Sequence, residues 1–210
     1  MNPNKEKSVS ICCIIMASGL GKRFGSNKLL TSLQGKPLFS YALSATALSC
    51  IAGRVIVTRY PEIKDYCQKN DVSCILHDMP DRNDTIALGV NFFLKEAPEV
   101  SGFLFLPADQ PCLTQRSVSL LCTTFLQNPD KICRLSYQDI AGTPVIFPAC
   151  YQNDLLCLPP KNGGSFIIKQ HPKQVLYVPA ADKRELMDVD TPEDLLSLSS
   201  TFPIQSQKNV

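Results

Sequence analysis

Short apolar runs rich in Val, Ile and Phe alternate along most of the chain with longer amphipathic segments. The predicted strands are Val9–Met16, Arg54–Thr58, Ser73–His77, Gly102–Leu106, Lys131–Ser136, Val145–Phe147 and Val175–Val178. The predicted helices are Pro37–Cys50, Pro61–Lys69, Asp84–Glu96, Thr114–Gln127, Tyr151–Leu158, Gly164–Gln170 and Pro192–Leu198. Strands separated by helices indicate βαβ crossovers, which place a mainly parallel sheet between two helical layers. We therefore expect a single-domain α/β fold, a Rossmann-like three-layer sandwich with a mainly parallel mixed sheet.

A length of 210 residues suits one domain, which we place at 9–200 between flexible ends at 1–8 and 201–210. The 21 Lys and Arg nearly balance the 19 Asp and Glu, so the charge predicts neither a nucleic acid nor a membrane surface as partner. The apolar runs are also shorter than the ~20 residues that cross a bilayer. We expect no targeting segment, because cleavage after the first apolar run would destroy the glycine-rich segment that follows it.

Ten cysteines are an unusual number for such a chain, and no two of them form a CxxC pair. This spacing argues against zinc ribbons and thioredoxin-like redox chemistry. Most of the cysteines lie in apolar stretches, where a free thiol packs as a small hydrophobe. We therefore expect reduced core cysteines and a cytoplasmic protein.

The glycine segment, residues 16–28, directly follows the first predicted strand. Ligands of open α/β sheets bind beyond the carboxyl ends of the strands. Gly19 and Gly21 allow the backbone to approach a ligand, and successive N–H groups can bind phosphate oxygens. Arg23 and Lys28 add positive charge. The segment predicts a phosphate site, whereas the alternative is a glycine turn with a solvated basic face, since neither a dinucleotide nor a P-loop spacing is present.

Acidic side chains lie in two further segments of the sequence, around Asp109 and around Asp188 and Asp190. Asp109 ends an apolar strand between two prolines, where a carboxylate can hold magnesium beside a polyphosphate. Asp188 and Asp190 share one face of an extended backbone, so one of them could join Asp109 around the metal. The alternative roles are local: a turn or cap for Asp109, a helix cap for Asp190 or Thr191, and a solvated Asp194.

The segment 77–89 combines small polar groups with a helix start. Asn83 and Thr85 could hydrogen-bond a nucleobase, and Gly89 permits close helix packing; N-capping by Asn83 or Asp84 is the alternative. His77 and His171 are isolated in the sequence, and neither predicts a catalytic dyad. We expect both to lie on the surface or to support other residues.

With these residues in place, the chain resembles the nucleotidyltransferases with a glycosyltransferase-A-like fold, and among them the molybdenum cofactor cytidylyltransferases. The resemblance extends from about Ile11 to Leu198. Residues 17–30 resemble the family's A-A-G-x-S-x-R-M-G-x-x-K-L-L motif. Four further stretches match the family in order and spacing: 35–38, 108–111, 142–148 and 188–194. Ser18 and Gly21 stand where the family usually has Ala and Ser, and residues 161–166 lack the acid and arginine of its G-D-x-G-A-R loop.

The resemblance implies a set of roles for these positions. The residues implied to bind the nucleotide are Ala17, Ser18, Gly19, Gly21, Arg23, Lys28, Asn83, Thr85, Gly89 and Asp109, with Arg23, Lys28 and Asp109 catalytic. Those implied to bind the acceptor are Gly142, Thr143, Pro144, Gly163 and Gly164, and those implied to bind magnesium are Asp109 and Asp190.

The implied reaction transfers CMP from CTP to the phosphate of a molybdopterin-type acceptor and releases pyrophosphate, with magnesium as cofactor. A molybdoenzyme or its chaperone would be the protein partner. Guanylyl transfer to the same cofactor and cytidylyl transfer to a sugar or polyol phosphate remain open. So does a non-catalytic nucleotide-binding factor for molybdoenzyme maturation, although a mere binder need not keep a paired acid set.

Overall fold

A seven-stranded mixed sheet forms the centre of the computed structural model, which describes residues 10–19, 21, 24 and 27–199. Its strand order is β5-β4-β1-β6-β8-β7-β9. The strands of this sheet are β1 (Ile11–Ala17), β4 (Ile51–Thr58), β5 (Ser73–Leu76), β6 (Gly102–Pro107), β7 (Ile132–Tyr137), β8 (Ile140–Pro148) and β9 (Val175–Pro179). The α-helices are α1 (Ser40–Ala45), α2 (Pro61–Lys69), α3 (Arg82–Glu96), α4 (Gln115–Gln127), α5 (Gln152–Leu156), α6 (Ser165–Gln170) and α7 (Pro192–Ser199).

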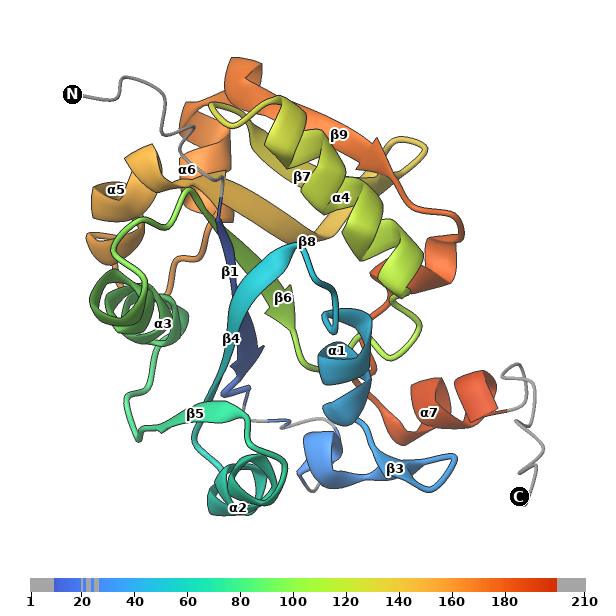
Figure 1. Cartoon of the computed structure of the whole chain (residues 1–210). Helices are drawn as coiled ribbons and strands as arrows, with labels where there is room; N and C mark the ends of the chain where they lie inside the picture. The colour runs from blue at the N-terminus through green and yellow to red at the C-terminus, as the bar shows by residue number, and fades with distance from the viewer. Residues whose placement is uncertain (1–9, 20, 22–23, 25–26, 200–210) are drawn as a thin grey trace.

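Helices cover both faces of the sheet, as the alternation of strands and helices predicted (Figure 1). One apolar core lies between the sheet and α1, α2 and α4, and it includes Phe39, Ile63 and Phe125. The other lies between the sheet and α3, α5 and α6, and it includes Phe93 and Leu155. Strand β1 contributes to both cores, because successive side chains of a strand point to opposite faces. The predicted three-layer α/β sandwich is confirmed.

Parallel pairing brings the carboxyl ends of the central strands to one edge of the sheet. β1 pairs in parallel with β4 on one side and β6 on the other, and β5 joins β4 in parallel. β8 runs antiparallel to both of its neighbours, β6 and β7. The residues that follow β1, β4, β5 and β6 therefore lie close together, at the edge where ligands of α/β folds bind.

A short hairpin between β2 (Ser32–Leu33) and β3 (Lys36–Pro37) differs from the prediction. The sequence predicted a helix over 37–50, but α1 covers only Ser40–Ala45. Gln34 and Gly35 adopt positive φ angles of 51° and 79°, which makes the tight turn between the two strands. Pro37 thus lies in a strand rather than in the first turn of a helix, whereas Pro61 and Pro192 do begin α2 and α7.

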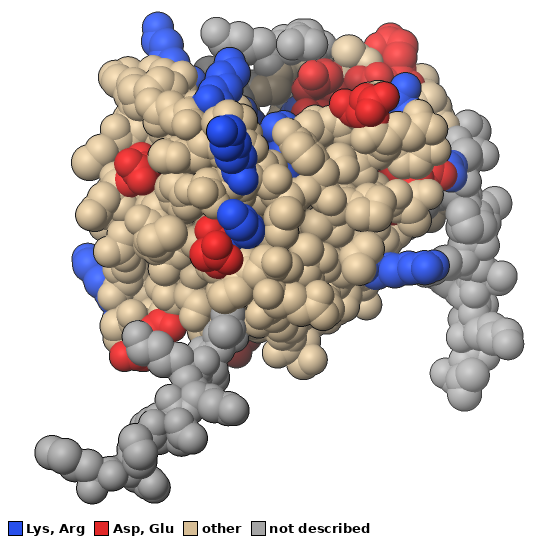
Figure 2. Space-filling view, turned by 90° about the horizontal axis from the view of Figure 1, so that it is seen from above, with Lys and Arg blue, Asp and Glu red and all other residues tan. Residues whose placement is uncertain are grey.

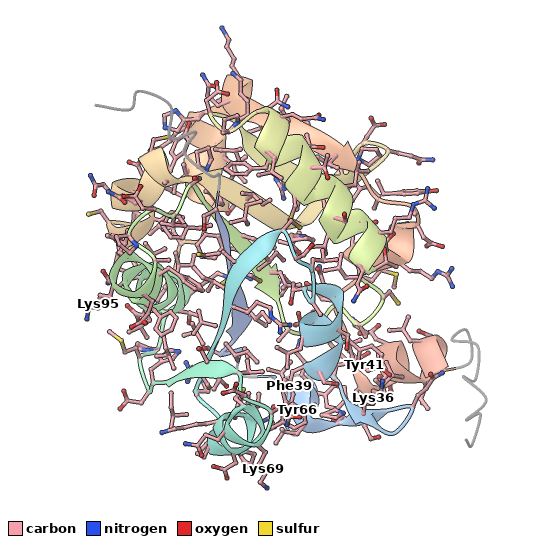
Figure 3. All side chains as sticks on the ribbon, in the orientation of Figure 1. Lys36, Phe39, Tyr41, Tyr66, Lys69 and Lys95 are labelled. Carbon is pink, nitrogen blue, oxygen red and sulfur yellow. The ribbon has the colours of Figure 1, made fainter. Side chains whose placement is uncertain are left out.

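Aromatic contacts anchor this hairpin region to the rest of the domain. Phe39 and Tyr66 pack edge to face with ring centroids 4.9 Å apart, and they lie side by side in Figure 3. The Tyr41 hydroxyl donates to the carbonyl oxygen of Leu33 at 2.7 Å. A small third cluster joins Leu33 to Val189, so the hairpin and the segment that carries Asp188 and Asp190 share one packed unit.

The remaining composition-based predictions concern cysteines, charge and the chain ends. All ten cysteines are free thiols, and five of them are buried. Figure 2 shows a mostly uncharged face on which charged side chains of both signs are scattered, some of them next to one another. Within the described residues, the helices are too short or too polar to cross a bilayer. The ends predicted to be flexible, 1–8 and 201–210, lie outside the described residues.

Candidate active site

A cleft of about 260 Å³ opens at the carboxyl ends of β1, β4 and β6. Its walls combine residues of the glycine segment with charged side chains from four different parts of the chain. The lining residues are Met16, Ser18, Gly19, Lys28, Leu29, Arg59, Pro80, Asp81, Arg82, Thr85, Pro107 and Asp109. The cleft thus lies where the polar residues that follow the strands were predicted to meet.

Lys28 occupies the centre of the charged group in this cleft. Its ammonium nitrogen lies 2.7 Å from Asp109 Oδ2 and 2.8 Å from Asp190 Oδ1. The Lys28 side chain is 8% exposed, and that of Asp109 is 18% exposed. Burial alone would lower the pKa of Lys28, but hydrogen bonds and charges from Asp109 and Asp190 outweigh it and raise the pKa. Lys28 therefore stays charged and holds together two acids that come from distant parts of the sequence.

The segment that carries the second acid is fixed to the Asp109 loop by its backbone. The amide of Val189 donates to the carbonyl oxygen of Asp109 at 2.9 Å, and its buried side chain anchors the segment in the third core cluster. Because Val189 points inward, Asp188 and Asp190 on either side of it both point toward Asp109, as predicted for alternate positions of an extended backbone.

Asp188 takes part in a different network from Asp190. Gln110 is 3% exposed, and its amide nitrogen donates to Asp188 Oδ1 at 2.9 Å and to Thr143 Oγ1 at 2.7 Å. Burial, together with the charges of Asp109 and Asp190, raises the pKa of Asp188. Gln110 thus links Asp188 to β8, which carries three of the five predicted acceptor residues.

Local capping explains the remaining acids of this segment. Asp194 accepts from the backbone amides of Asp190 and Thr191 at 3.0 and 2.8 Å, and Thr191 Oγ1 accepts from the Asp194 amide at 3.2 Å. This reciprocal pair begins α7. The alternative in which Asp194 only faces solvent is therefore wrong, whereas the capping role considered for Thr191 is confirmed.

The start of the glycine segment is held by the last residue of β4 and the two residues that follow it. Thr58 Oγ1 donates to the carbonyl oxygen of Ala17 at 3.0 Å, Arg59 Nε to that of Ser18 at 2.7 Å, and the Tyr60 hydroxyl to that of Gly19. Three consecutive side chains thus engage three consecutive carbonyl groups. Ser18 and Gly19 line the cleft, whereas Ala17 is buried beneath them.

Two further members of the glycine segment bear on its predicted role. Gly21 has a φ of 55°, a left-handed conformation that favours glycine over the Ser usual in the family. Arg23, predicted to be catalytic and to bind the nucleotide, lies outside the described residues.

The predicted nucleobase residues on α3 have different surroundings. Thr85 is buried and lines the cleft. Asn83 Oδ1 accepts from the Lys161 amide at 3.1 Å, so its side chain fixes a neighbouring loop and is not part of the cleft lining. A Cβ atom on Gly89 would lie 2.5 Å from Ile14 Cγ2, so this glycine lets α3 pack against β1 and does not line the cleft.

The start of α3 also differs from the prediction. Asp81 is the N-cap, and the Asp84 carboxylate accepts from the Asp81 amide at 3.1 Å in a capping box. The helix therefore begins at Arg82 rather than at Asp84.

A second cavity of about 160 Å³ adjoins the cleft and shares Met16, Arg82 and Pro107 with it. Its walls are mostly apolar, with the polar groups of Arg82, Arg134, Thr143 and Ser165 added. The remaining lining residues are Ile86, Phe105, Leu106, Val145, Phe147, Leu155, Gly164 and Ile168. An apolar cavity with a few convergent polar groups is typical of a small-molecule site.

Two of the five predicted acceptor residues, Thr143 and Gly164, line this second cavity. Gly142 packs against Leu186, where a Cβ atom would lie 2.8 Å from Leu186 Cδ2. Gly163 leaves room for the Arg82 side chain in the same way. Neither of these glycines, nor Pro144, is part of the cavity lining.

The carboxylates of Asp109 and Asp190 fit a divalent metal ion such as magnesium that also takes ligands from outside the protein. Asp109 Oδ1 is buried and finds no hydrogen-bond donor among the described residues. A carboxylate oxygen without a partner, beside a second carboxylate, is the donor set that Mg²⁺ prefers, with phosphates and water completing its coordination. No group of three or more potential ligands preforms a metal cage in the described part of the chain.

Several cleft residues were not predicted from the sequence. Arg59 follows a predicted strand at the ligand-binding edge, so the rule applied to the other strands would have found it. Arg82 is exposed at the junction of the cleft and the second cavity, and its guanidinium has no partner among the described residues. His77, predicted to be a surface or supporting residue, is half-buried and contacts Ser18.

Solved structures similar to this one include several nucleotidyltransferases. A CMP:2-keto-3-deoxy-manno-octonic acid synthetase complexed with CTP is 15% identical, with a TM-score of 0.72 over 91% of this chain and 98% of the other. The 4-diphosphocytidyl-2C-methyl-D-erythritol synthase of Anaerococcus prevotii DSM 20548 is 15% identical, with a TM-score of 0.72 over 92% and 96%. Rv0371C of Mycobacterium tuberculosis H37Rv, in complex with manganese, is 15% identical, with a TM-score of 0.70 over 91% and 99%.

These likenesses show a shared fold, and no curated protein sequence matches the chain significantly. The family assignment comes from the sequence itself. Residues 13–175 match the model of the MobA-like NTP transferase domain, and this stretch contains the glycine segment, Lys28, Asp109 and the walls of the second cavity. The chain therefore belongs to the family of MobA-like NTP transferase domains, which are nucleotidyltransferases.

Proposed function

We propose that the protein is a magnesium-dependent CTP:molybdenum cofactor cytidylyltransferase. The observation that carries the proposal is the contact of the Lys28 ammonium with both Asp109 and Asp190, in a cleft lined by the glycine segment. A cation and two carboxylates beside a glycine-rich backbone suit a triphosphate and its metal. A cytoplasmic location is part of the proposal, since buried free thiols suit a reducing compartment.

In the proposed reaction, an oxygen of the acceptor phosphate attacks the α-phosphorus of CTP. The bond from that phosphorus to the oxygen that bridges to the β-phosphate breaks, and pyrophosphate leaves. Such a reaction needs little covalent work from the protein, so catalysis depends on positioning and on stabilising charge. Lys28, Arg59 and the backbone of Ser18 and Gly19 are the described groups that line the proposed triphosphate site.

Asp109 and Asp190 would hold the magnesium ion, whose chemistry is to neutralise phosphate charge and orient the triphosphate. Asp188 accepts a hydrogen bond from Gln110 and would position Gln110 and, through it, Thr143 rather than bind the metal. Thr85, on the buried face of α3, would lie beside the nucleoside, and Arg23 remains a proposed phosphate ligand.

The second cavity is the proposed acceptor site. Its apolar walls suit a flat ring system, and Arg134 and Thr143 supply polar groups at its rim. Arg82 lies where the cleft and the cavity meet, so its guanidinium is placed to contact an acceptor phosphate next to the nucleotide. A molybdoenzyme or its chaperone would receive the product.

Cytidylyl transfer to a sugar or polyol phosphate is the second candidate. It is favoured by the likeness to a CMP:2-keto-3-deoxy-manno-octonic acid synthetase and to a 4-diphosphocytidyl-2C-methyl-D-erythritol synthase. Gly21, in place of the Ser usual in cytidylyltransferases of the molybdenum cofactor, points the same way. Guanylyl transfer and a non-catalytic nucleotide-binding role are further outcomes that the test must separate.

The test measures pyrophosphate release from CTP, GTP, ATP and UTP, each with molybdopterin, a sugar phosphate or a polyol phosphate as acceptor, with and without magnesium. The proposal predicts release only with CTP, molybdopterin and magnesium together. Release with CTP and a sugar or polyol phosphate would favour the second candidate, and release with GTP would favour a guanylyltransferase. Stabilisation of the fold by CTP, about 2.7 kcal/mol at 100 times its Kd, without any turnover would favour the non-catalytic factor.

A further inference from the structure

The first residues of the glycine segment present no free carbonyl oxygen to the cleft. The carbonyl groups of Ala17, Ser18 and Gly19 each accept a hydrogen bond from a side chain in 58–60. A carbonyl oxygen that faced the triphosphate would repel its negatively charged oxygens. The arrangement removes this repulsion, and it leaves the Ser18 hydroxyl as the only polar side-chain group of these three residues.

The Ser18 hydroxyl makes two hydrogen bonds, and only one of them can use its hydrogen. Ser18 Oγ donates to the carbonyl oxygen of Val57 at 3.0 Å and lies 2.7 Å from Nε2 of His77. Because a carbonyl oxygen can only accept, the hydroxyl hydrogen points to Val57. His77 Nε2 must then carry a hydrogen and donate it to Ser18.

The other ring nitrogen of His77 supports the same assignment. Nδ1 is buried and finds no hydrogen-bond partner among the described residues. A proton on Nδ1 would therefore be buried without an acceptor, which is costly. The charged groups around the ring are Arg59, Asp78 and Asp84; burial and then the charge of Arg59 lower the pKa of His77, against the two acids. The neutral ring with its proton on Nε2 is thus the form that the surroundings favour.

This geometry excludes Ser18 as a nucleophile activated by histidine. A general base must accept the proton of the hydroxyl, whereas here the histidine donates and the hydroxyl hydrogen is directed to Val57. The contact instead joins the loop after β5, which carries His77, to the start of the glycine segment. Ser18 stands where the family usually has Ala, so the contact is a property of this chain rather than of the motif.

We propose that His77 is a positioning residue for the nucleoside triphosphate: its Nε2–H holds Ser18, and thereby keeps the backbone of Ser18 and Gly19 in the conformation that receives the phosphates. This inference rests on the proposed function in one respect, the identity of the ligand as a nucleoside triphosphate. Arg59 holds the same residue from the backbone side, so the two contacts fix Ser18 at both its carbonyl and its hydroxyl. The apparent affinity for a ligand falls with the fraction of time that the loop spends in the binding conformation, so a loop that is held there binds at its full affinity.

The test is the Kd of CTP, or of whichever nucleoside triphosphate stabilises the wild type most, measured by calorimetry for four single variants and one double variant. His77→Leu removes the donor, and we expect the Kd to rise about tenfold, as when a loop spends a tenth of its time in the competent conformation. His77→Gln keeps an N–H near the position of Nε2 and is expected to restore the Kd to within about twofold of wild type. His171→Gln is the matched control, because this other histidine packs against Tyr151 and is not part of the cleft lining.

The fourth variant, Ser18→Ala, removes the same hydrogen bond from its other end and keeps the test available if His77→Leu does not fold. We expect it to weaken binding, and we expect the double variant Ser18→Ala with His77→Leu to bind no more weakly than the weaker single variant. Equal Kd values for wild type and His77→Leu would overturn the inference and leave the proposed function standing. So would a His77→Gln variant as weak as His77→Leu, since a packing role would then explain both. A wild type that binds no nucleoside triphosphate would overturn the proposed function and the inference together.

Discussion

Replacing Lys28 by methionine removes the cation that holds Asp109 and Asp190 together while keeping an unbranched side chain in the same space. The Lys28–Asp109 pair is largely buried, with side-chain exposures of 8% and 18%. Asp190 is 44% exposed, so water already screens its share of the interaction. The variant thus removes the Lys28 cation from one buried and one partly solvated carboxylate.

The magnitude follows from the buried pair. Breaking a buried ion pair by removing one partner costs about 3–5 kcal/mol, and an exposed pair contributes about 0.2–1 kcal/mol. We take the lower end, about 3 kcal/mol, because Asp109 keeps some contact with water. One kcal/mol corresponds to about 2–4 °C in Tm for a domain of this size, so the Tm of Lys28→Met should fall by about 6–12 °C.

The assay is thermal denaturation at pH 7 in EDTA, and then in millimolar magnesium. Because the variant loses the Lys28 charge that faces both carboxylates, magnesium should restore more of its Tm than it adds to the wild type. Lys173→Ala, which changes an exposed lysine away from the cleft, serves as the control. A Tm within about 2 °C of wild type, or an equal magnesium effect on both proteins, would refute the argument that Lys28 neutralises a metal-binding acid pair.

Three further changes follow from the structure. The pKa of Asp188 is raised in the folded chain, so the ionised carboxylate lowers the stability of the fold as the pH rises above about 4. Asp188→Asn keeps an acceptor for Gln110 and should therefore have a higher Tm than the wild type at pH 7. This difference in Tm should disappear in acid, where Asp188 is protonated. The pKa of His77 is lowered in the folded chain, so the wild type should lose stability as the pH falls below about 6.5. The Tm of His77→Gln, which lacks this titration, should fall less than that of the wild type between pH 7.5 and 5. Gly89→Ala places a Cβ atom 2.5 Å from Ile14 Cγ2, and overpacking of this kind should cost about 1–3 kcal/mol in denaturant unfolding; an unchanged midpoint would mean that α3 can move away from β1 at no cost.

The sheet and most of its helices could be predicted, because apolar runs and their spacing report burial directly. The β2–β3 hairpin could not, since its two strands are only two residues long and its turn depends on the positive φ angles of Gln34 and Gly35. Asp109 was predicted because it ends a buried strand, where the fold brings ligands. For Asp190 the sequence allowed either a place beside Asp109 or a local capping role. The hydrogen bond from the Val189 amide to the Asp109 carbonyl brings the two acids together, and the sequence pattern does not reveal this contact.

The residues that the sequence did not reveal act through contacts between distant segments. His77 is isolated in the sequence, and only the parallel pairing of β5, β4 and β1 brings it to Ser18. Gln110 lies in the stretch 108–111 that resembles the family, but its link between Asp188 and Thr143 depends on contacts between segments far apart in the sequence. Gly89 shows the reverse case, since its packing role was predicted correctly and its implied place in the nucleotide site was not supported by the lining of the cleft.

The central claim is that the cleft around Asp109 catalyses nucleotidyl transfer. Its most direct test is the turnover of CTP and molybdopterin with magnesium, followed by pyrophosphate release and by the cytidylylated product. The account predicts the two products in equal amounts, and a loss of turnover of about 10²–10³ in Asp109→Ala and Lys28→Ala, as for one charge-stabilising group, with Asp154→Ala on the exposed face of α5 unchanged. Near-normal turnover in Asp109→Ala would contradict it, because the reaction would then take place without the acid on which the site is built.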